Sequence, residues 1–300
     1  MADIHQPHDR LFRSVFSDAS EAAALLQAAL PDSVGDNFDW TTLTLVDGTF
    51  IDEDLQGSQS DLLYQVEHAA TRQPMSMYLL FEHQSSPDPW MPLRLLRYCC
   101  RIWEADRRDD PGRRELRPIM PVVFYQGARG WNHPTEFSDL FPETARALPW
   151  VPRFTHELID QTALTPEAVA GDVRGRIAQL LMMVAFDRHV DRALQLTAQL
   201  ILSLSQAGGE ADEFRRFFLY LASTQDREVI ERFGEALQRQ GLQQGDEIMT
   251  YAEEVRAEVQ VEMVEGLLRV GVTWDVIEAA TGLTEAKFQE LKAQLPASGS

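Results

Sequence analysis

Apolar residues recur at intervals of three and four in the first thirty positions, a spacing that collects them on one face of a helix. The pattern breaks before Asp18, which can cap a second helix, with Glu21 at the capping-box position. Pro31 cannot continue a helix and ends the stretch. We therefore expect a broken helical segment over residues 8–30.

Strand-like patterns replace the helical one after residue 40. Residues 41–51 predict two short strands around Asp47-Gly48, a pair favoured in two-residue hairpin turns. Residues 61–68 predict a further strand, and residues 75–83 predict one that is almost continuously apolar. Such a run is typical of a strand in the centre of a sheet, where both faces are buried.

The middle of the chain adds a helix and a strand before the pattern turns helical to the end. Pro92 suits the first turn of a helix that runs to about Arg108, and residues 116–127 predict a strand. From about residue 163 the chain is almost wholly helical, with a break over 205–212. This order is typical of an α/β fold with a mixed central sheet, followed by a mostly α-helical C-terminal region. The predicted domains are an α/β core over 1–160, a helical extension packed on it over 161–240 and a small helical module over 241–300.

The composition is that of an ordinary globular protein. Hydrophobic residues make up 44% of the 300 residues, and no apolar run reaches the roughly 18–20 residues of a membrane-spanning helix. The N-terminus lacks a basic region followed by an apolar stretch, so we expect no secretory signal. Cys99 and Cys100 are adjacent and match neither a disulfide framework nor a zinc site. We expect a cytoplasmic protein with no membrane partner.

Charge is unevenly distributed along the chain. The net charge of −20 argues against a generally basic nucleic-acid-binding protein but leaves room for a local basic face. Residues 91–117 hold eight arginines against five acids, whereas residues 1–90 hold 15 acids against three arginines. Arg94, Arg97 and Arg101 share one face of the predicted helix and could hold a phosphate backbone. A solvated charged face is the simpler interpretation of such a helix taken alone.

Acidic residues mark the ends of the two strands predicted over 61–68 and 75–83. If these strands pair as an antiparallel hairpin, Asp61 and Glu82 lie at the same edge of the sheet, and Gln84 shares the face of Glu82. Two carboxylates in one site favour a bound cation. Oxygen ligands suit Mg²⁺ or Mn²⁺, which can activate a water for attack on phosphorus. Acids at the ends of strands are also common without any catalytic role.

Four segments carry a resemblance to a known family. An aspartate followed about twenty residues later by Glu-x-Gln, at the end of an apolar strand, resembles the PD-(D/E)XK nuclease core in its (D/E)…ExQ form. The segments HDRLFRSVF, DLLYQV, YLLFEHQSSPDPWMPLRLLRYCCRIWE and PVVFYQG are similar to the YhgA-like transposases, or Rpn recombination-promoting nucleases. The similarity covers roughly residues 5–240. It implies a restriction-endonuclease-like core and a metal-dependent DNA endonuclease related to mobile elements.

Carried over position by position, the resemblance makes Asp61 and Glu82 the metal-binding acids. Gln84 takes the place where the motif usually has a lysine. A lysine would supply a proton or a positive charge, whereas a glutamine can only form hydrogen bonds. Either the metal alone would lower the pKa of the water, or an arginine such as Arg94 would supply the charge. The glutamine is typical of the family, so it does not argue against activity.

Other residues are weaker candidates for the same site. Glu21 matches the acid that some of these nucleases place on their first helix, although a cap or a solvent-facing side chain is the simpler interpretation. Asp9 matches the opening of the family sequence, but a His-Asp pair at a helix start also serves as a cap or a packing contact. Tyr98 lies one turn after Arg94 and can orient a phosphate or simply pack.

The helical C-terminal half is better suited to assembly than to catalysis. Residues 264–292 have the pattern of three short helices and resemble a helix-turn-helix unit. Their few basic residues favour packing or oligomerisation over DNA binding. The apolar series from Ile248 to Leu267, spaced by three and four, is consistent with a helix docked on a partner. A homodimer would suit a nuclease that cuts two strands.

We predict a divalent-metal-dependent DNA endonuclease that serves recombination, transposition-like processes or defence against foreign DNA. One alternative is a catalytically inactive protein that keeps the nuclease fold and binds partners through its acidic helical half. Another is an inhibitor, built from residues 163–300, that mimics DNA by its negative charge. The predicted residues are Asp61, Glu82 and Gln84 in the catalytic site and Arg94, Arg97, Tyr98 and Arg101 on the DNA.

Overall fold

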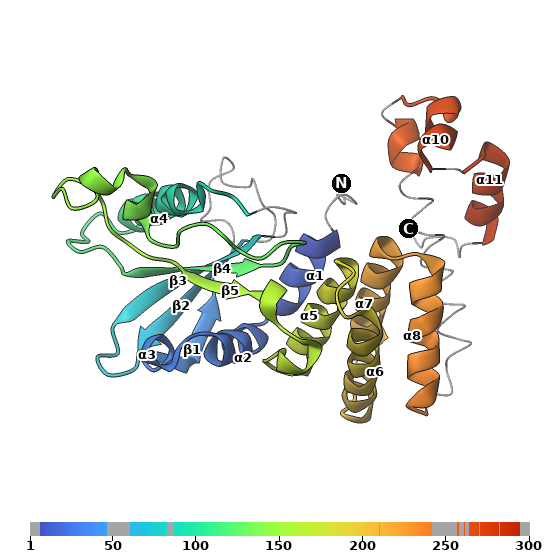
Figure 1. The fold of residues 1–300 in the computed structure, drawn as a ribbon, viewed down its shortest axis with the longest axis horizontal. Coiled ribbons are helices and arrows are strands. Elements are labelled where there is room, and N and C mark those ends of the chain that lie inside the picture. The colour runs from blue at the N-terminus through green and yellow to red at the C-terminus, as the bar shows by residue number, and fades with distance from the viewer. Residues whose placement is uncertain are drawn as a thin grey trace. The chain divides into compact units, whose positions relative to one another are not determined.

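The computed structural model shows two compact units, one formed by residues His8–His189 and the other centred on Val190–Ser300 (Figure 1). The three domain limits expected from the sequence stay predictions. The structure describes residues 7–46, 61–82, 87–209, 211–241, 257, 261, 264–269, 271–281 and 283–294, without the side chains of 78–82, 211–212, 279–280 and 294. The predicted Asp47-Gly48 hairpin lies outside these residues.

A five-stranded sheet forms the centre of the first unit. Its strands follow one another in chain order, β1-β2-β3-β4-β5. The pairs β1–β2 and β2–β3 are antiparallel, whereas β3–β4 and β4–β5 are parallel. The sheet is therefore mixed, and the apolar strand predicted at its centre is the central strand, which confirms the predicted fold class. The bounds are β1 Phe38–Leu45, β2 Leu62–His68, β3 Pro74–Glu82, β4 Ile119–Tyr125 and β5 Glu157–Asp160.

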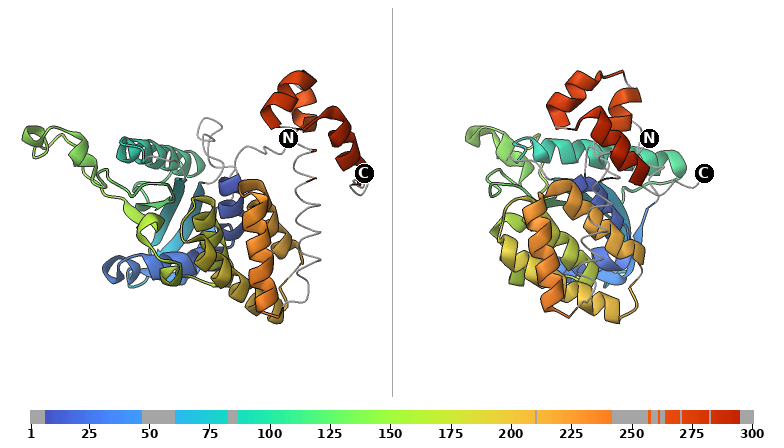
Figure 2. Two further views of the ribbon diagram at one scale, coloured as in Figure 1. Left: turned by 45° about the vertical axis from the view of Figure 1, so that its right-hand side comes forward. Right: turned by 90° about the vertical axis from the view of Figure 1, so that its right-hand side faces the viewer.

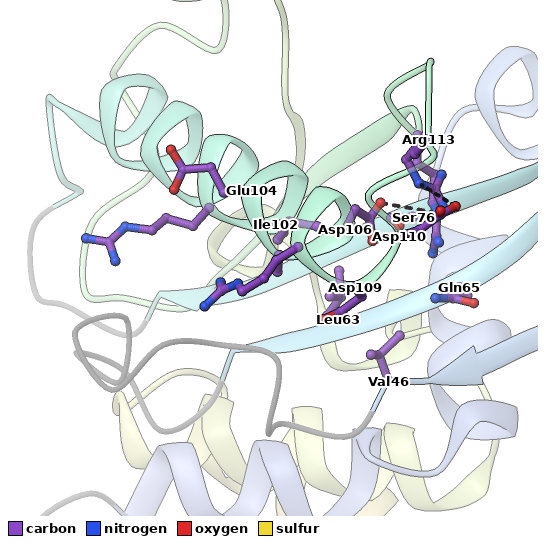
Figure 3. Close-up of a pocket in the computed structure, with 14 residues that line it drawn as sticks. Val46, Leu63, Gln65, Ser76, Ile102, Glu104, Asp106, Asp109, Asp110 and Arg113 are labelled. Atoms are coloured by element: carbon purple, nitrogen blue, oxygen red, sulfur yellow. Dashed lines mark ion pairs between the residues drawn. The ribbon is translucent and has the colours of Figure 1, made fainter.

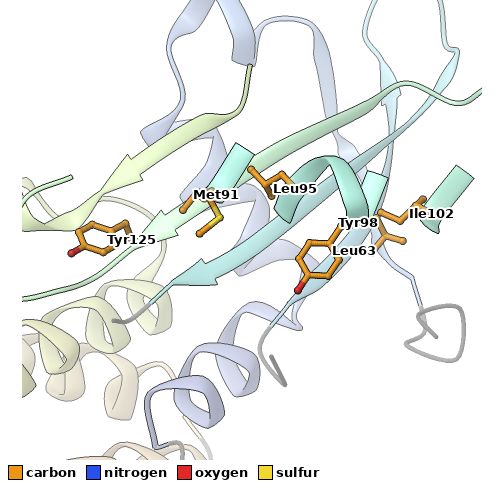
Figure 4. Close-up of a cluster of buried hydrophobic side chains, with 7 residues drawn as sticks. Leu63, Met91, Leu95, Tyr98, Ile102 and Tyr125 are labelled. Carbon is orange, nitrogen blue, oxygen red and sulfur yellow. The ribbon is translucent and has the colours of Figure 1, made fainter. Parts of the chain in front are cut away.

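One face of the sheet is covered by α4, which spans Met91–Asp109. Its buried side chains Leu95 and Ile102 belong to one cluster with Leu63 of β2 and Tyr125 of β4 (Figure 4). The helix starts at a proline-containing turn, as predicted, and its apolar stripe of three- and four-residue spacing faces the sheet. Because side chains alternate along a strand, the odd-numbered positions of β2 and β4 define this α4 face.

The opposite face is covered by α1 and α2, as the views in Figures 1 and 2 show. The helices span Pro7–Phe16 and Ala19–Ala29, and Asp18 caps the second by accepting a hydrogen bond from the Ser20 amide, which confirms the predicted break. Phe12 lies 5.3 Å from Phe124 between ring centroids. The Tyr64 hydroxyl donates to the Phe16 carbonyl oxygen. Even-numbered positions of β2 and β4 therefore face α1.

Shorter elements and α5 complete this unit. The strand β5 was not predicted from the sequence, since four residues carry too little pattern to be recognised. The predicted strand over 116–127 is confirmed as the shorter β4. The remaining bounds are α3 Asp32–Gly35, α5 Val173–Ala185 and the 3₁₀ turns Phe137–Leu140, Glu143–Ala145, Gln161–Ala163 and Pro166–Ala168.

The second unit is helical, as predicted. An ion pair joins Arg232 of α8 to Asp191 of α6, and Phe218 of α7 contacts Phe233 of α8 at 5.7 Å between ring centroids. Further along, Val264, Ile277 and Phe288 share a small apolar cluster of their own. Along the described helices, no segment combines the length and apolar character needed to cross a membrane. The bounds are α6 Val190–Gln206, α7 Ala211–Thr224, α8 Arg227–Arg239, α10 Trp274–Thr281 and α11 Glu285–Gln294.

Candidate active site

The start of β2 and the end of β3 meet at one edge of the sheet. The two strands pair antiparallel with Leu62 opposite Leu79, as the hairpin hypothesis requires. Continuing this register by one step sets Asp61 opposite position 80, two residues before Glu82. Directly opposed residues share a face, and so do residues two apart on one strand. The backbone therefore places positions 61 and 82 on the same face at the same edge.

This face is the one that α4 covers, because Asp61 lies two residues before Leu63 of the α4 cluster. Asp61 is only 8% exposed, unlike an acid that merely ends a strand at the surface. Carboxylates are rarely buried unless a partner or an ion compensates their charge. The burial therefore favours a specific role for this side chain over a solvated strand end.

The structure does not describe the side chains of the other two predicted catalytic residues, Glu82 and Gln84. The Glu82 side chain and the whole of Gln84 lie outside the described residues. Among the side chains that the structure describes, no group of three histidines, cysteines or acids could hold a metal ion. The ligand set of a metal site at this edge therefore stays a prediction.

The predicted substrate-binding residues on α4 differ in their surroundings. Tyr98 is buried and belongs to the cluster with Leu63 and Tyr125, while its hydroxyl accepts a hydrogen bond from Arg94 Nε at 3.3 Å. The Arg94 guanidinium lies 5.8 Å from the Tyr98 ring centroid. Tyr98 therefore packs and also orients Arg94 on the same side of the sheet as Asp61. Arg97 is exposed, and Arg101 is partly buried.

A cavity of about 240 Å³ lies on this face, between β2 and the C-terminal half of α4 (Figure 3). Leu63 and Gln65, two and four residues beyond Asp61, line it together with Arg101. Four arginines and four carboxylates lie around it, so its formal charge is balanced in a chain of net charge −20. Some of these charges pair with each other, as in the contact of 3.5 Å between Arg117 Nε and Asp106 Oδ2.

Cys99 does not contribute a reactive group. Its side chain is buried, and loss of hydration raises the pKa of the thiol to about 12. The thiolate, which is the nucleophilic form, is therefore scarce at neutral pH.

Glu21 lies elsewhere, at the junction of α2 and α5. It is 5% exposed, and its Oε2 accepts a hydrogen bond of 2.9 Å from the Gly175 amide in the first turn of α5. Burial raises the pKa of this carboxyl, whereas the Gly175 hydrogen bond and the nearby Arg174 oppose that shift. The solvent-facing role considered from the sequence is therefore wrong, because the side chain is buried, and it bonds the first turn of a distant helix.

Asp9 lies in the first turn of α1 and is 2% exposed. Because α1 covers the Phe124 face, Asp9 belongs to the side of the sheet opposite α4. Its neighbour His8 stacks on Phe186 at 5.3 Å between ring centroids, which is the packing contact considered for this pair.

Two buried glutamines that follow strand ends were not singled out by the sequence analysis. Gln126 directly follows β4 and is fully buried, and Gln161 directly follows β5 and is 1% exposed. Gln126 follows β4, the neighbour of β3, and Gln161 follows β5, the neighbour of β4. The signal for Gln126 was available, since an amide after an apolar strand repeats the pattern of Glu82 and Gln84. The signal for Gln161 was not, because β5 itself was not recognised.

The mixed sheet, the helices on both of its faces and the acidic edge define an α/β protein consistent with a restriction-endonuclease-like core. The sequence model of the family described as "Putative transposase, YhgA-like" matches residues 6–213. The chain belongs to this family.

Curated relatives from Escherichia coli carry the name of recombination-promoting nucleases. RpnD of strain O157:H7 is 29% identical over 255 residues, which cover 83% of this chain and 94% of the relative. RpnA of strain K12 is 27% identical over 289 residues, with 94% and 96% covered. RpnE of strain K12 is named an inactive recombination-promoting nuclease-like protein and is 28% identical over 299 residues, with 93% and 95% covered. No solved structure matches the chain.

Proposed function

We propose that this protein is a divalent-metal-dependent DNA endonuclease whose active site lies at the edge where β2 starts and β3 ends. The observation that carries the proposal is the buried Asp61 carboxylate, which the strand register sets on the same face and at the same edge as position 82. The family and the names of RpnD and RpnA support nuclease chemistry. Their names also suggest a role in recombination.

The donor set at this edge fits a hard divalent cation. Asp61 and Glu82 would hold Mg²⁺ or Mn²⁺, since carboxylates are preferred oxygen ligands of both. When bound, such an ion lowers the pKa of a coordinated water and offsets negative charge on the phosphate. Gln84 would orient the water or a phosphate oxygen by hydrogen bonds, because an amide can donate and accept but cannot ionise.

The arginines of α4 would bind the DNA backbone next to this site. Arg94 is oriented by its hydrogen bond to Tyr98, on the same face as Asp61. Exposed Arg97 and partly buried Arg101 continue the positive series along the helix. Phosphate contacts of this kind give affinity without sequence preference, and they weaken as the salt concentration rises. A homodimer would supply one site per DNA strand, although the apolar series proposed for it lies mostly outside the described residues.

Cleavage of supercoiled plasmid at low salt tests the proposal. The wild-type protein should cut in Mg²⁺ or Mn²⁺ and stop when EDTA is added, whereas Asp61→Ala and Glu82→Ala should not cut in any metal. Circular dichroism and urea unfolding of each variant would show whether the fold is retained. Cutting that persists in EDTA, or equally fast cutting by folded Asp61→Ala, would contradict the assignment of the site.

A second candidate function is a binding protein that keeps the fold without catalysis. The observation in its favour is the similarity to RpnE, which is named inactive and covers almost the whole chain. The two functions differ in metal affinity. If the protein is an endonuclease, the wild type should bind Mn²⁺ and Asp61→Ala should bind it much more weakly. If it is only a binding protein, the wild type and Asp61→Ala should have the same Mn²⁺ affinity.

A further inference from the structure

Trp90 is a large apolar side chain that the fold leaves in contact with solvent. It is 58% exposed, and Leu93, one turn further along the chain, is 41% exposed. Single exposed apolar residues are common on protein surfaces, whereas two at neighbouring positions of one helix form a continuous patch. Water is an unfavourable surrounding for such a patch. Packing in the core therefore does not account for these two side chains.

Helix formation does not account for Trp90 either. It stands directly before the first residue of α4, where serine, threonine, aspartate and asparagine are preferred as caps, and its side chain makes no capping hydrogen bond. Its backbone is nevertheless held in place. The Trp90 amide donates to Asp88 Oδ1 at 2.8 Å, and the Met91 amide donates to the Asp88 carbonyl at 3.2 Å. Trp90 thus presents its indole from a fixed backbone, which favours a role in binding a partner.

The surface that continues from Trp90 along α4 carries arginines and no acids. Residues three and four apart are neighbours on a helix, so Arg94 lies one turn from Trp90 and Arg97 lies one turn from Leu93. Residues 89–103 contain three arginines and no aspartate or glutamate, in a chain with 47 acids and a net charge of −20. The partner that fits this surface is therefore anionic and also offers a flat apolar face.

The start of α4 lies at the same end of the sheet as the proposed active site. The helix begins at Met91, soon after the end of β3. Ile102, in its later half, lines one cavity with Ser76, which is near the start of β3 (Figure 3). The helix therefore runs back over the sheet, from the end of β3 towards its start. Trp90 is consequently at the end of α4 that is next to the edge with Asp61.

We propose that Trp90 stacks on an unpaired base of the DNA while the arginines of α4 bind the adjoining phosphates. The inference rests on the proposed endonuclease function and names its substrate class, which is DNA with unpaired bases next to the cut. A base has a flat face on which an aromatic ring can stack, and its backbone is anionic. In a duplex the neighbouring bases cover both faces, so an indole on the protein surface reaches a base face only where pairing is interrupted.

An anionic membrane surface also combines apolar and negatively charged groups, but it fits this surface less well. Membrane-binding helices bury a whole apolar face, whereas only Trp90 and Leu93 are large exposed apolar residues on the described α4. The Arg94 Nε donates to the Tyr98 hydroxyl at 3.3 Å, which orients the guanidinium. A charge held in one orientation suits a discrete phosphate beside a stacked base.

The test measures DNA binding in EDTA at low salt, where the proposed enzyme cannot cut. The probes are a strand of thymines with one central 2-aminopurine and the same strand in a duplex. Stacking quenches the emission of 2-aminopurine, and the anisotropy of a fluorescein-labelled copy gives the affinity. Trp90→Ala and Trp90→Phe are compared with the wild type and with Trp150→Ala. Trp150 is a matched control, because it is 74% exposed in the same unit but lies between β4 and β5.

We expect Trp90→Ala to weaken binding of the single strand by about 5- to 150-fold, the usual effect of removing an aromatic side chain that stacks on one base. The loss should be much smaller on the duplex, and the 2-aminopurine should be less quenched than with the wild type. Trp90→Phe should recover most of the affinity for the single strand, because it keeps an aromatic ring. Trp150→Ala should bind both probes like the wild type.

Two results would overturn the inference and leave the endonuclease intact. One is equal affinity of the wild type and folded Trp90→Ala for the single strand, or an equal loss on both probes. The other is a loss of binding by Trp90→Ala to vesicles of phosphatidylglycerol with no change on the oligonucleotides, which would assign the patch to a membrane surface. A wild type that binds neither probe and cuts no plasmid in Mg²⁺ or Mn²⁺ would overturn the proposed function as well.

Discussion

Two regions of the first unit each bury a carboxylate, and they differ in what surrounds it. At the α2–α5 junction, Glu21 accepts the Gly175 amide and joins two helices. At the edge of the sheet, Asp61 lies beside the end of β3, on the same face as position 82. The first region uses its polar groups to hold elements together. The second concentrates them where strands end, which is where chemistry can reach a substrate.

The largest expected difference between the two regions is in DNA cleavage. Asp61→Asn and Glu21→Gln make the same nearly isosteric change from acid to amide. Asp61→Asn should slow plasmid cutting by at least about 100-fold, because losing a metal ligand should cost no less than losing an outer partner. Glu21→Gln should cut at the wild-type rate, since its amide oxygen can still accept the Gly175 N–H.

The same pair of variants can also break the comparison. Equal loss of cutting by folded Glu21→Gln would make Glu21 a catalytic acid, as the resemblance to nucleases with an acid on the first helix allows. If Asp61→Asn cut plasmid at the wild-type rate, the assignment of the active site to this edge of the sheet would be wrong. Single-turnover rates at saturating Mg²⁺ would separate slower chemistry from weaker metal binding.

The sequence predicted the features that depend on near neighbours. The break at Asp18 follows from a local cap, and the meeting of Asp61 with position 82 follows from one short hairpin. The burial of Glu21 could not be predicted, because its partner Gly175 is 154 residues away in the chain. Gln126 comes next to the end of β3 through a parallel pairing, in which β4 follows β3 only after the whole of α4. Contacts of this kind leave no periodic pattern in the sequence.

A third buried ionisable group should affect stability rather than cutting. His156 is 3% exposed, and neither of its ring nitrogens has a hydrogen-bond partner in the part of the chain described. Burial lowers the pKa of His156 from 6.5 to about 4. The unfolded chain therefore binds a proton between these pH values that the folded chain does not. Its contribution to stability should be complete above pH 6.5 and should be lost as the pH falls towards 4, by on the order of 3 kcal/mol at most.

Urea unfolding between pH 4 and 7 measures this effect. His156→Leu should flatten the pH dependence, because no proton can bind there in either state. His133→Leu is the matched control, since His133 also meets the Trp131 ring edge-on but is only partly buried. An unchanged slope in His156→Leu would assign the acid sensitivity to other groups.

The smallest expected effect concerns the charge of Glu21 itself. Because the pKa of this carboxyl is raised in the folded state, mainly by burial, the folded chain holds the proton more tightly than the unfolded chain. The stability contributed by the group is therefore present below its ordinary pKa of 4.5 and is lost as the pH rises through the raised value.

Glu21→Gln removes the buried charge and keeps the acceptor for Gly175, while the pairing lost with Arg174, at 4.0 Å, is weak. We expect Glu21→Gln to raise the free energy of unfolding at pH 7 by about 1 kcal/mol and to have little effect near pH 4. Glu21→Ala should lower it by about 1–3 kcal/mol, because the buried Gly175 amide then loses its partner. Urea unfolding at the two pH values checks both signs, and a Glu21→Gln variant less stable than the wild type at pH 7 would show that the negative charge itself supports the junction.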